Sequence, residues 1–256
     1  MFFLFNEFIC RPLYNLLVLV YDIIPFHDFG LAIIIVTLLI KFMLFPLSRK
    51  QIESQKKMQE AQPKIKEIQE KYKNDKAKQS RAVMEFYKQN KTNPFSGCLP
   101  TIFQLVFLIA IYRVLFNISQ AGLRVEEQQL YSFVANPGQI NQYFLGLIDL
   151  SKAIDLSHLT FGSAAQIALV ISAAAAQYFQ TKMLMPKKLP EKGKHQDISQ
   201  IMSKQMLYLG PFLTLFIGIR FPSGLALYWL VSTILAILQQ FYMMKNEKLA
   251  KGGNNT

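Results

Sequence analysis

Residues 30–47, GLAIIIVTLLIKFMLFPL, form an apolar segment that carries one charged side chain, Lys41. An apolar run of about 20 residues predicts a membrane-spanning helix. Thr37 precedes Lys41 by four residues, so a helix would place its hydroxyl and the ammonium group on one face. Because an ionisable group inside a span is costly and usually functional, the segment predicts a membrane protein with a polar site around Lys41.

A second interpretation of Lys41 requires no function. Lys41 lies seven residues before Ser48, about 10 Å along a helix axis, and a lysine side chain can extend toward the membrane surface over much of that distance. The segment by itself leaves both interpretations open. Polar residues in the other spans are needed to choose between them.

Composition also places the chain among helical membrane proteins. Hydrophobic residues make up 52% of the chain and charged residues only 17%, and the chain contains 21 phenylalanines. This composition is unusual for a water-soluble domain. The net charge of +12 indicates no nucleic-acid ligand, because the basic residues are concentrated between the apolar segments. Cys10 and Cys98 fall on opposite sides of the predicted membrane and cannot pair within one chain. With neither a cleaved signal peptide nor a mitochondrial presequence indicated, a bacterial plasma membrane is the expected location.

We predict an all-α membrane protein with five transmembrane helices, its N-terminus outside and its C-terminus inside. The apolar core of the fourth span, residues 206–219, has 14 residues, about 21 Å of helix against a hydrocarbon core of about 30 Å, so preceding residues such as Ile198, Ile201 and Met202 are expected to lengthen it. The predicted segments are an N-terminal interfacial segment (1–29), a first span (30–47), a cytoplasmic helical hairpin (48–96), a second span (97–116), an extracytoplasmic loop (117–160), a third span (161–185), a cytoplasmic loop (186–200), a fourth span (201–219), a fifth span (224–244) and a basic cytoplasmic tail (245–256).

Residues 2–24 contain no uninterrupted apolar run. Glu7, Arg11 and Asp22 are charged, and Pro12 lies among the apolar residues. An amphipathic helix at the membrane interface is therefore favoured, with a further span as the alternative.

The hairpin prediction rests on 13 basic residues and on apolar residues at helical spacing. Asn74-Asp75 marks a turn between two antiparallel helices, and the first helix is expected to restart near Pro63. A solvated charged spacer and a docking arm are both consistent with this composition.

The basic residues also determine the orientation. The hairpin, the loop after the third span (counted to Lys204) and the tail contain 13, 5 and 3 of the 28 lysines and arginines, whereas residues 117–160 contain 2. By the positive-inside rule the first three segments are cytoplasmic and the N-terminus is outside.

The candidate substrate site consists of the polar and amphipathic residues that the predicted spans carry. No acidic residue occurs within any of the five spans, and an unpaired charge at the centre of a bilayer costs roughly 3 kcal/mol on insertion scales. The site is therefore expected to be a wet, positively charged concavity that receives polar or acidic stretches of another molecule. Its predicted residues are Lys41, Thr37, Gln104, Tyr228, Trp229 and Ser232.

Catalytic functions are disfavoured by the sequence. His27, His158 and His195 all lie outside the spans, and there is no nucleophile elbow, HExxH motif or phosphate-binding glycine loop. We therefore predict no catalytic residue, no metal site and no cofactor. A channel or transporter is the stronger rival, but proton-coupled transport usually uses intramembrane carboxylates, and no inverted repeat is visible.

Four ordered runs resemble the YidC family of membrane protein insertases, relatives of the mitochondrial and chloroplast insertases. The resemblance covers roughly residues 20–245. It implies a five-helix core with a cytoplasmic helical hairpin, enclosing a hydrophilic groove that is open to the cytoplasm and to lipid but closed to the outside. The four runs are IVTLLIKFMLFPLSRKQ, MQEAQPKIKEIQEKY, FYKQNKTNPFSGCLPTIFQ and FPSGLALYWLVSTILAILQQ.

The resemblance also implies roles for individual residues. The family places a positive residue, usually arginine, in the groove where this chain has Lys41, so the charge is kept but the two-pronged guanidinium is not. Thr37, Gln104, Trp229 and Ser232 look like groove-lining positions. The large periplasmic domain and the long basic ribosome-binding tail of some members are missing, which argues against tethering of a ribosome by the tail.

The expected function is the insertion and folding of nascent membrane proteins. The Sec translocon, the ribosome and the signal recognition particle are possible partners, membrane lipids are expected, and direct recognition of nucleic acid is not. An assembly chaperone that only helps inserted helices to pack would share the same fold and is the alternative.

Overall fold

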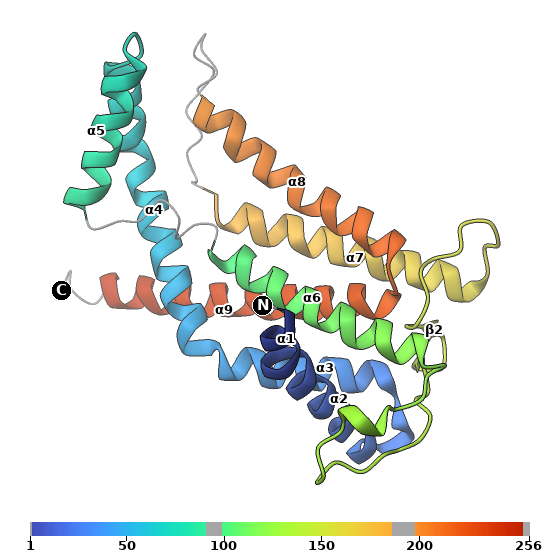
Figure 1. Cartoon of the computed structure of the whole chain (residues 1–256). Coiled ribbons are helices and arrows are strands. Elements are labelled where there is room, and N and C mark those ends of the chain that lie inside the picture. Colours follow the sequence, from blue (N-terminus) through green and yellow to red (C-terminus); the bar gives the residue numbers. More distant parts are fainter. Residues whose placement is uncertain (1, 91–98, 186–197, 253–256) are drawn as a thin grey trace.

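The computed structural model describes residues 2–90, 99–185 and 198–252, most of which are helical. Cys98, His195 and the last four residues of the predicted tail lie outside the described residues. Figure 1 shows a bundle of helices with a helical hairpin projecting at the end where the C-terminus lies, and a small β-hairpin at the opposite end.

The N-terminal residues form one continuous helical segment, made of α1 (Phe2–Phe5), the π-helical turn η1 (Asn6–Cys10) and α2 (Arg11–Ile23). Glu7 and Arg11 pair at 3.1 Å. Pro12 lies in the first turn of α2, directly after the π-helical turn, where its missing N–H is tolerated. Phe3–Ile23 therefore has the length and apolarity of a membrane span, although the sequence favours an interfacial helix there.

The predicted first span is not straight. The chain turns through the short 3-10 helix η2 (Pro25–His27) into α3 (Phe29–Met43), which ends at a 68° bend before α4 (Phe45–Lys71). Pro46 explains the bend, because it has no N–H to donate to the carbonyl of Phe42 and its ring crowds that turn. The prediction of one helix over 30–47 is wrong in this respect, and α3 with its 15 residues is only about 22 Å long.

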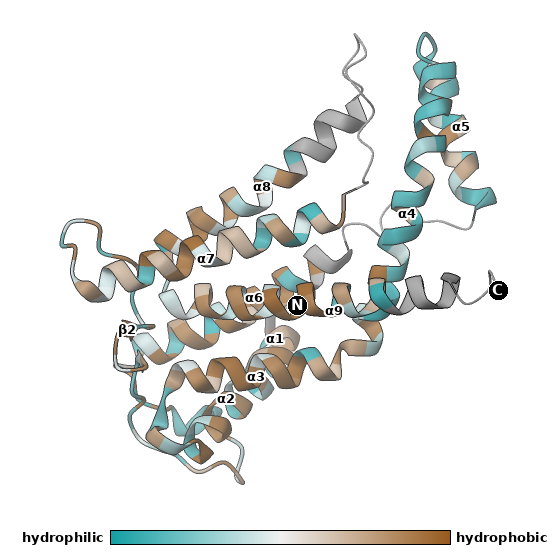
Figure 2. Cartoon of the chain, turned by 180° about the vertical axis from the view of Figure 1, so that it is seen from behind, coloured by the Kyte–Doolittle hydropathy of each residue, from teal (hydrophilic) through white to brown (hydrophobic). Residues whose placement is uncertain are grey.

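The next two helices form the hairpin that the sequence predicts. α4 packs against α5 (Lys76–Gln89), and Asn74 and Asp75 lie in the connection. Pro63 lies inside α4, so the expected restart of the helix there is wrong. One proline leaves only the carbonyl of Gln59 without its helical donor, which a 27-residue helix tolerates. Figure 2 shows that this hairpin is mainly hydrophilic, whereas the bundle is mainly hydrophobic.

Asp75 caps the first turn of α5. Its Oδ1 accepts a hydrogen bond from the backbone N–H of Lys78 at 3.0 Å, and its Oδ2 lies 3.3 Å from the Lys78 ammonium. Hydrogen bonds from the Lys78 backbone and then from its side chain lower the pKa of Asp75. A carboxylate with a lowered pKa stabilises the turn above the pKa of the unfolded chain, and this stabilisation is lost as the pH falls through the folded pKa.

We expect Asp75→Ala to increase the exchange of the first α5 amides roughly several-fold, because the cap acceptor is lost. Hydrogen exchange read by mass spectrometry over residues 76–80 measures this. Asp75→Asn is the matched control, since asparagine caps as well but does not titrate, and it should keep the protection at neutral pH. Equal exchange in the alanine and asparagine variants would contradict the cap.

The remaining long helices are α6 (Leu99–Gln120), α7 (Phe161–Met183), α8 (Ile198–Arg220) and α9 (Ser223–Gly252). They correspond to the second to fifth predicted spans. α8 begins at Ile198, so the residues before the short apolar core of the fourth span lengthen its helix, as the sequence predicts. α9 lies at the centre and packs against α3, α6, α7 and α8. By length and composition, the described residues contain three helices able to cross a membrane, or four if α3 and α4 form one broken span: Phe3–Ile23, Phe161–Met183 and Ser223–Lys245, with Gln104–Gln120 and Leu207–Arg220 as shorter apolar helices.

The segment between α6 and α7 contains the only strands among the described residues, which the all-α prediction misses. After the 3-10 turn η4 (Glu127–Gln129), β1 (Tyr143–Phe144) and β2 (Ile148–Asp149) pair antiparallel, with Tyr143 opposite Asp149 and Phe144 opposite Ile148. Gly146, with a φ of +70°, supplies the left-handed backbone of the turn.

This β-hairpin ties together the adjacent ends of three helices. Asp28, at the start of α3, accepts hydrogen bonds from the N–H groups of Leu31 and Leu145 through its two carboxylate oxygens, at 3.0 and 2.7 Å. Beyond the hairpin, the carbonyls of residues 149, 150 and 152 accept hydrogen bonds from Gln166 of α7 and from the first amides of α9. The fold is therefore fixed at this end by hydrogen bonds that join this segment to α3, α7 and α9.

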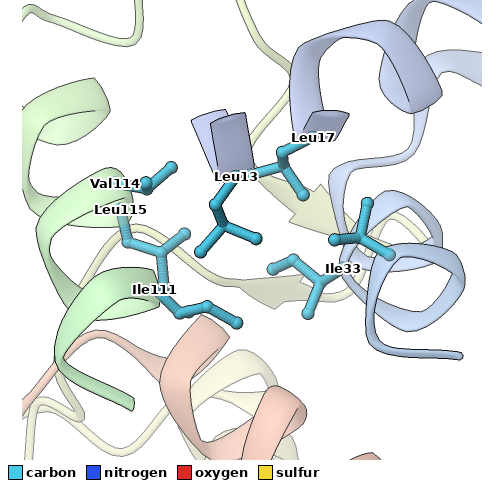
Figure 3. Close-up of a pocket in the computed structure, with 7 residues that line it drawn as sticks. Leu13, Leu17, Ile33, Ile111, Val114 and Leu115 are labelled. Carbon is cyan, nitrogen blue, oxygen red and sulfur yellow. The ribbon is translucent and has the colours of Figure 1, made fainter. Parts of the chain in front are cut away.

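The apolar core includes the N-terminal helix. Figure 3 shows a small cavity where α2, α3 and α6 meet, and every side chain that lines it is aliphatic. None of the predicted site residues borders it, so it marks a packing junction and not a ligand site. Its lining residues are Leu13, Leu17, Ile33, Val36, Ile111, Val114 and Leu115.

Candidate functional site: a buried polar layer around α9

Gln104 and Ser232 meet between α6 and α9. The Ser232 hydroxyl donates to Gln104 Oε1 at 3.1 Å, and Ser232 is only 1% exposed. Gln104 Nε2 is buried and has no hydrogen-bond partner within the described part of the chain. A buried N–H group without a partner costs free energy unless water or a ligand accepts its hydrogen bond. This pair therefore offers a donor for a polar group that enters from outside the protein.

Gln177 of α7 bonds to the same helix on a neighbouring face. Its Oε1 accepts hydrogen bonds from Trp229 Nε1 at 3.0 Å and from the Thr233 hydroxyl at 3.5 Å. A side chain at Gly210 of α8 would approach Gln177, because a Cβ built there lies 3.6 Å from its Cγ. Gln177 thus occupies the junction of α7, α8 and α9. We call Gln104, Gln177, Trp229, Ser232 and Thr233 the polar layer.

Two predicted site residues are buried near the polar layer without extending it. Thr37 is 1% exposed, and its hydroxyl donates to the carbonyl of Ile33 in its own helix at 2.6 Å, so its proton is not available to a substrate. Tyr228 is also buried, and its side chain interacts with that of Ser232 one turn further along α9.

Lys41 lies at the depth of the polar layer. Gly224 of α9 faces Ile33 of α3, since a Cβ at Gly224 would lie 3.4 Å from Ile33 Cδ1. The two helices pack together and run in the same direction (Figure 1). Lys41 and Ser232 each follow this contact by eight residues, about 12 Å along their helices. The Cα atoms of Lys41 and Ser232 therefore lie at similar depths along the two helices.

The surroundings of Lys41 supply no opposite charge. Its side chain is half-buried, and among the described residues no group forms an ion pair or hydrogen bond with it. It occupies the last turn of α3 before the bend, where a cation is favoured by the helix dipole. The bend also brings Lys41 closer to the end of its helix than a straight helix over 30–47 would.

The chemistry of the site is that of binding. Amide, hydroxyl and indole groups can hold peptide groups, and a lysine can hold an anion. The described residues contain no cluster of three metal-ligating side chains. Of the six predicted residues, Gln104, Trp229 and Ser232 belong to the polar layer, Thr37 and Tyr228 are buried beside it, and Lys41 lies level with it.

The sequence prediction did not include Gln177 or Thr233. Gln177 could have been found by the argument applied to Gln104, because it is an amide inside a predicted span and an amide in lipid needs a partner. Thr233 had no such signal, since a threonine in a span can bond to its own helix, as Thr37 does.

Replacing Gln177 by methionine is expected to lower the free energy of unfolding by roughly 1 kcal/mol, because the Trp229 N–H loses its acceptor while the volume is kept. Since Trp229 is the only tryptophan of the chain, its emission should also shift to shorter wavelength. Thermal unfolding in detergent and fluorescence measure both effects. Gln180→Met, one turn further along α7, is the matched control, and an equal response there would contradict the role of Gln177.

Comparison with known proteins identifies a family of membrane proteins. A model of the 60Kd inner membrane protein family matches residues 20–251. The chain is similar to a protein of Geobacter sp. strain M21 named membrane protein insertase YidC, with 35% identity over 218 residues, covering 85% of this chain and 34% of that protein. A relative of the same name from Syntrophus aciditrophicus is 36% identical over 239 residues, covering 93% of this chain and 37% of the relative.

The relatives differ in length. The chain spans about a third of the length of the Geobacter and Syntrophus relatives. In Fusobacterium nucleatum, however, a protein also named membrane protein insertase YidC is 33% identical over 219 residues, and the match covers 85% of this chain and 87% of that protein. The shared region is thus close to the whole of the Fusobacterium relative.

Proposed function

The chain belongs to the 60Kd inner membrane protein family, and we propose that it inserts nascent integral membrane proteins into a bacterial plasma membrane and helps them to fold. The proposal draws on the relatives that carry the name membrane protein insertase. It assigns the chain no catalytic residue and no cofactor, because insertion makes and breaks no covalent bond.

The observation that carries the proposal is a lysine without a carboxylate at the depth of a buried polar layer. An enzyme site or a proton-coupled transporter would be expected to contain acidic or metal-ligating groups. Lys41 and the unpartnered amide N–H of Gln104 instead suit a transient ligand with peptide carbonyls and negative charges. The polar stretch that precedes or follows a transmembrane segment has this chemistry.

In the proposed mechanism the substrate divides between the groove and the lipid. Lys41 attracts the polar, often acidic, end of the nascent chain, and the polar layer opens to a groove that holds it partway across the bilayer. The apolar segment meanwhile follows the outward faces of α6 and α9, which expose Leu105 and Ile109 and then Ile234 and Leu238. Transfer of this apolar segment into lipid supplies the driving force, so the chain itself needs no nucleotide.

The proposed topology has five spans, with the N-terminus outside and the C-terminus in the cytoplasm. In this proposal the helix that ends at Ile23 lies along the outer interface, because its residues 14–21 bond to the extracytoplasmic loop. The hydroxyls of Tyr14 and Tyr21 accept hydrogen bonds from the backbone N–H groups of Glu126 and Asn141, and Asn15 Oδ1 accepts from that of Tyr131. The α4–α5 hairpin then faces the cytoplasm, where the ribosome and the signal recognition particle are possible partners, and the Sec translocon is a possible partner in the membrane.

An assembly chaperone without insertion activity of its own is the second candidate function. It is favoured by the burial of the polar layer, since Trp229 is only 8% exposed and Ser232 1%. A protein that keeps this layer closed would offer only its apolar surface to helices already in the membrane.

Photocrosslinking tests the proposed function. A photoreactive amino acid at position 104 or 232 should crosslink to a stalled nascent chain that carries one transmembrane segment. As the stalled chain is made longer, the crosslinked substrate residue should shift along the substrate sequence. Phe42, 84% exposed on α3, is the control position that faces away from the layer. Crosslinks at position 42 alone would contradict entry of the substrate into the groove.

A further inference from the structure

The turn before α3 and the turn of the β-hairpin expose large apolar side chains close to each other. Phe26 is 90% exposed and Leu145 63% exposed, and Ile23 and Leu147 beside them are also exposed. Asp28 joins the two turns, because it follows Phe26 by two residues and accepts the hydrogen bond from the N–H of Leu145. We call Ile23, Phe26, Leu145 and Leu147 the outer apolar patch.

The backbone conformations make the exposure of this patch unusual. Phe26 has a φ of 73° and Leu145 a φ of 52°, a left-handed region that residues other than glycine and asparagine rarely adopt. Both residues therefore keep a large apolar side chain at a position where a glycine would be the ordinary choice. Such a combination is expected where the side chain itself makes a contact.

The β-hairpin holds the patch in a fixed position relative to α3. The Phe144 ring packs directly on Gly30, where a Cβ would lie 2.2 Å from its Cδ2. Asp28 adds the two hydrogen bonds to Leu31 and Leu145. The patch is therefore attached to the first turn of α3 by this packing contact and these hydrogen bonds.

The length of α3 indicates what covers the patch. Its 15 residues give about 22 Å of helix, about 8 Å less than the hydrocarbon core of a bilayer. The patch continues the apolar surface of the chain beyond the outer end of this short helix. Polar side chains border it at Asp22 and His27, which are exposed, as is typical of segments at a membrane interface.

We propose that the outer apolar patch inserts into the outer leaflet of the bilayer and thereby sets the depth of α3. The partner is the lipid surface at the boundary of headgroups and acyl chains. The patch supplies the apolar length that α3 lacks, and it holds Lys41 at a constant distance from the outer surface. The proposal uses the topology given above but does not depend on insertase activity.

Tryptophan quenching in liposomes tests the proposal. Leu145→Trp and Phe26→Trp are made separately in the full chain, and the emission of Trp229 in the parent protein is subtracted as background. Leu238→Trp, on the exposed face of α9, is the control for lipid contact, and Lys78→Trp, on the α4–α5 hairpin, is the control for water. Phosphatidylcholine with brominated acyl chains quenches from the lipid, and iodide quenches from the water.

The expected result is a loss of emission from both patch reporters in brominated lipid that is similar to the loss for Leu238→Trp, with little quenching by iodide. Quenching by iodide to the extent of Lys78→Trp would overturn the proposal. Protection from both quenchers would overturn it as well, since the patch would then be covered by protein. Because the emission is read without a substrate, these outcomes are independent of whether the chain inserts proteins.

Discussion

Replacing Lys41 by alanine is expected to reduce insertion of a substrate with an acidic outer segment by about tenfold, equivalent to about 1.4 kcal/mol. The reason is that Lys41 is the charge at the depth of the polar layer and has no carboxylate partner there among the described residues. Lys41→Arg should keep most of the activity, because an attraction in a partly dry site depends on charge more than on geometry. Protease protection of the inserted substrate in liposomes measures the yield.

Lys50→Ala is the matched control for this prediction. Lys50 is an exposed lysine in the first turns of α4, so its removal changes the net charge equally without touching the polar layer. It should insert the substrate as the unaltered protein does. If Lys41→Ala also inserted at the unaltered rate, Lys41 would be a lysine that only extends to the cytoplasmic surface.

Gly30→Ala is expected to lower the free energy of unfolding by about 1–3 kcal/mol, the range for inserting an atom into a packed site. The added Cβ would lie 2.2 to 2.7 Å from three atoms of the Phe144 side chain, which the Asp28–Leu145 hydrogen bond holds in place. The β-hairpin must shift for the alanine to fit. Thermal unfolding in detergent, followed by circular dichroism, measures the loss.

Gly162→Ala supplies the control for Gly30→Ala. Gly162 is a helical glycine at the start of α7, and a Cβ there would lie no closer than 3.4 Å to a neighbouring atom. This variant should be neutral or slightly stabilising, since alanine favours a helix over glycine. In the double variant Gly30→Ala with Phe144→Ala, part of the lost stability should return, and equal losses in all variants would contradict the contact.

The sequence predicts the long helices well, because their signal is local. Apolar runs of sufficient length, the basic segments between them and the turn at Asn74-Asp75 each depend on neighbouring residues only. The bend at Leu44 shows the limit of such reasoning. Phe45 and Leu47 are apolar, so they extend the apolar run in the sequence. The direction that the chain takes after the break at Pro46 depends on its surroundings, and the run does not predict it.

Features that depend on distant pairs are not visible in the sequence. The strands β1 and β2 have two residues each, too few for a periodic pattern, and they are stabilised by contacts to Asp28 and Gly30 more than a hundred residues away. The N-terminal helix is a different case, because its stabilising ion pair is local: Glu7 and Arg11 pair at 3.1 Å within one turn, and the helix continues past them.

The candidate site was predicted by residue type but not by pairing. Polar residues inside spans identify Gln104 and Ser232, and the structure adds that they bond to each other at 3.1 Å. Thr37 was selected by the same rule, yet its hydroxyl satisfies the carbonyl of Ile33. Which polar group in a span faces its own helix, a neighbour or an entering ligand depends on the tertiary packing.

The most direct test of the proposed function is insertion by the protein alone. The purified chain is reconstituted into liposomes without a translocon, a single-span substrate is synthesised in their presence, and the protected fragment is compared with that from empty liposomes. We predict a clear excess of inserted substrate over empty liposomes, and its loss in Lys41→Ala. Insertion no greater than in empty liposomes would contradict autonomous insertion and would leave the assembly chaperone as the function of this fold.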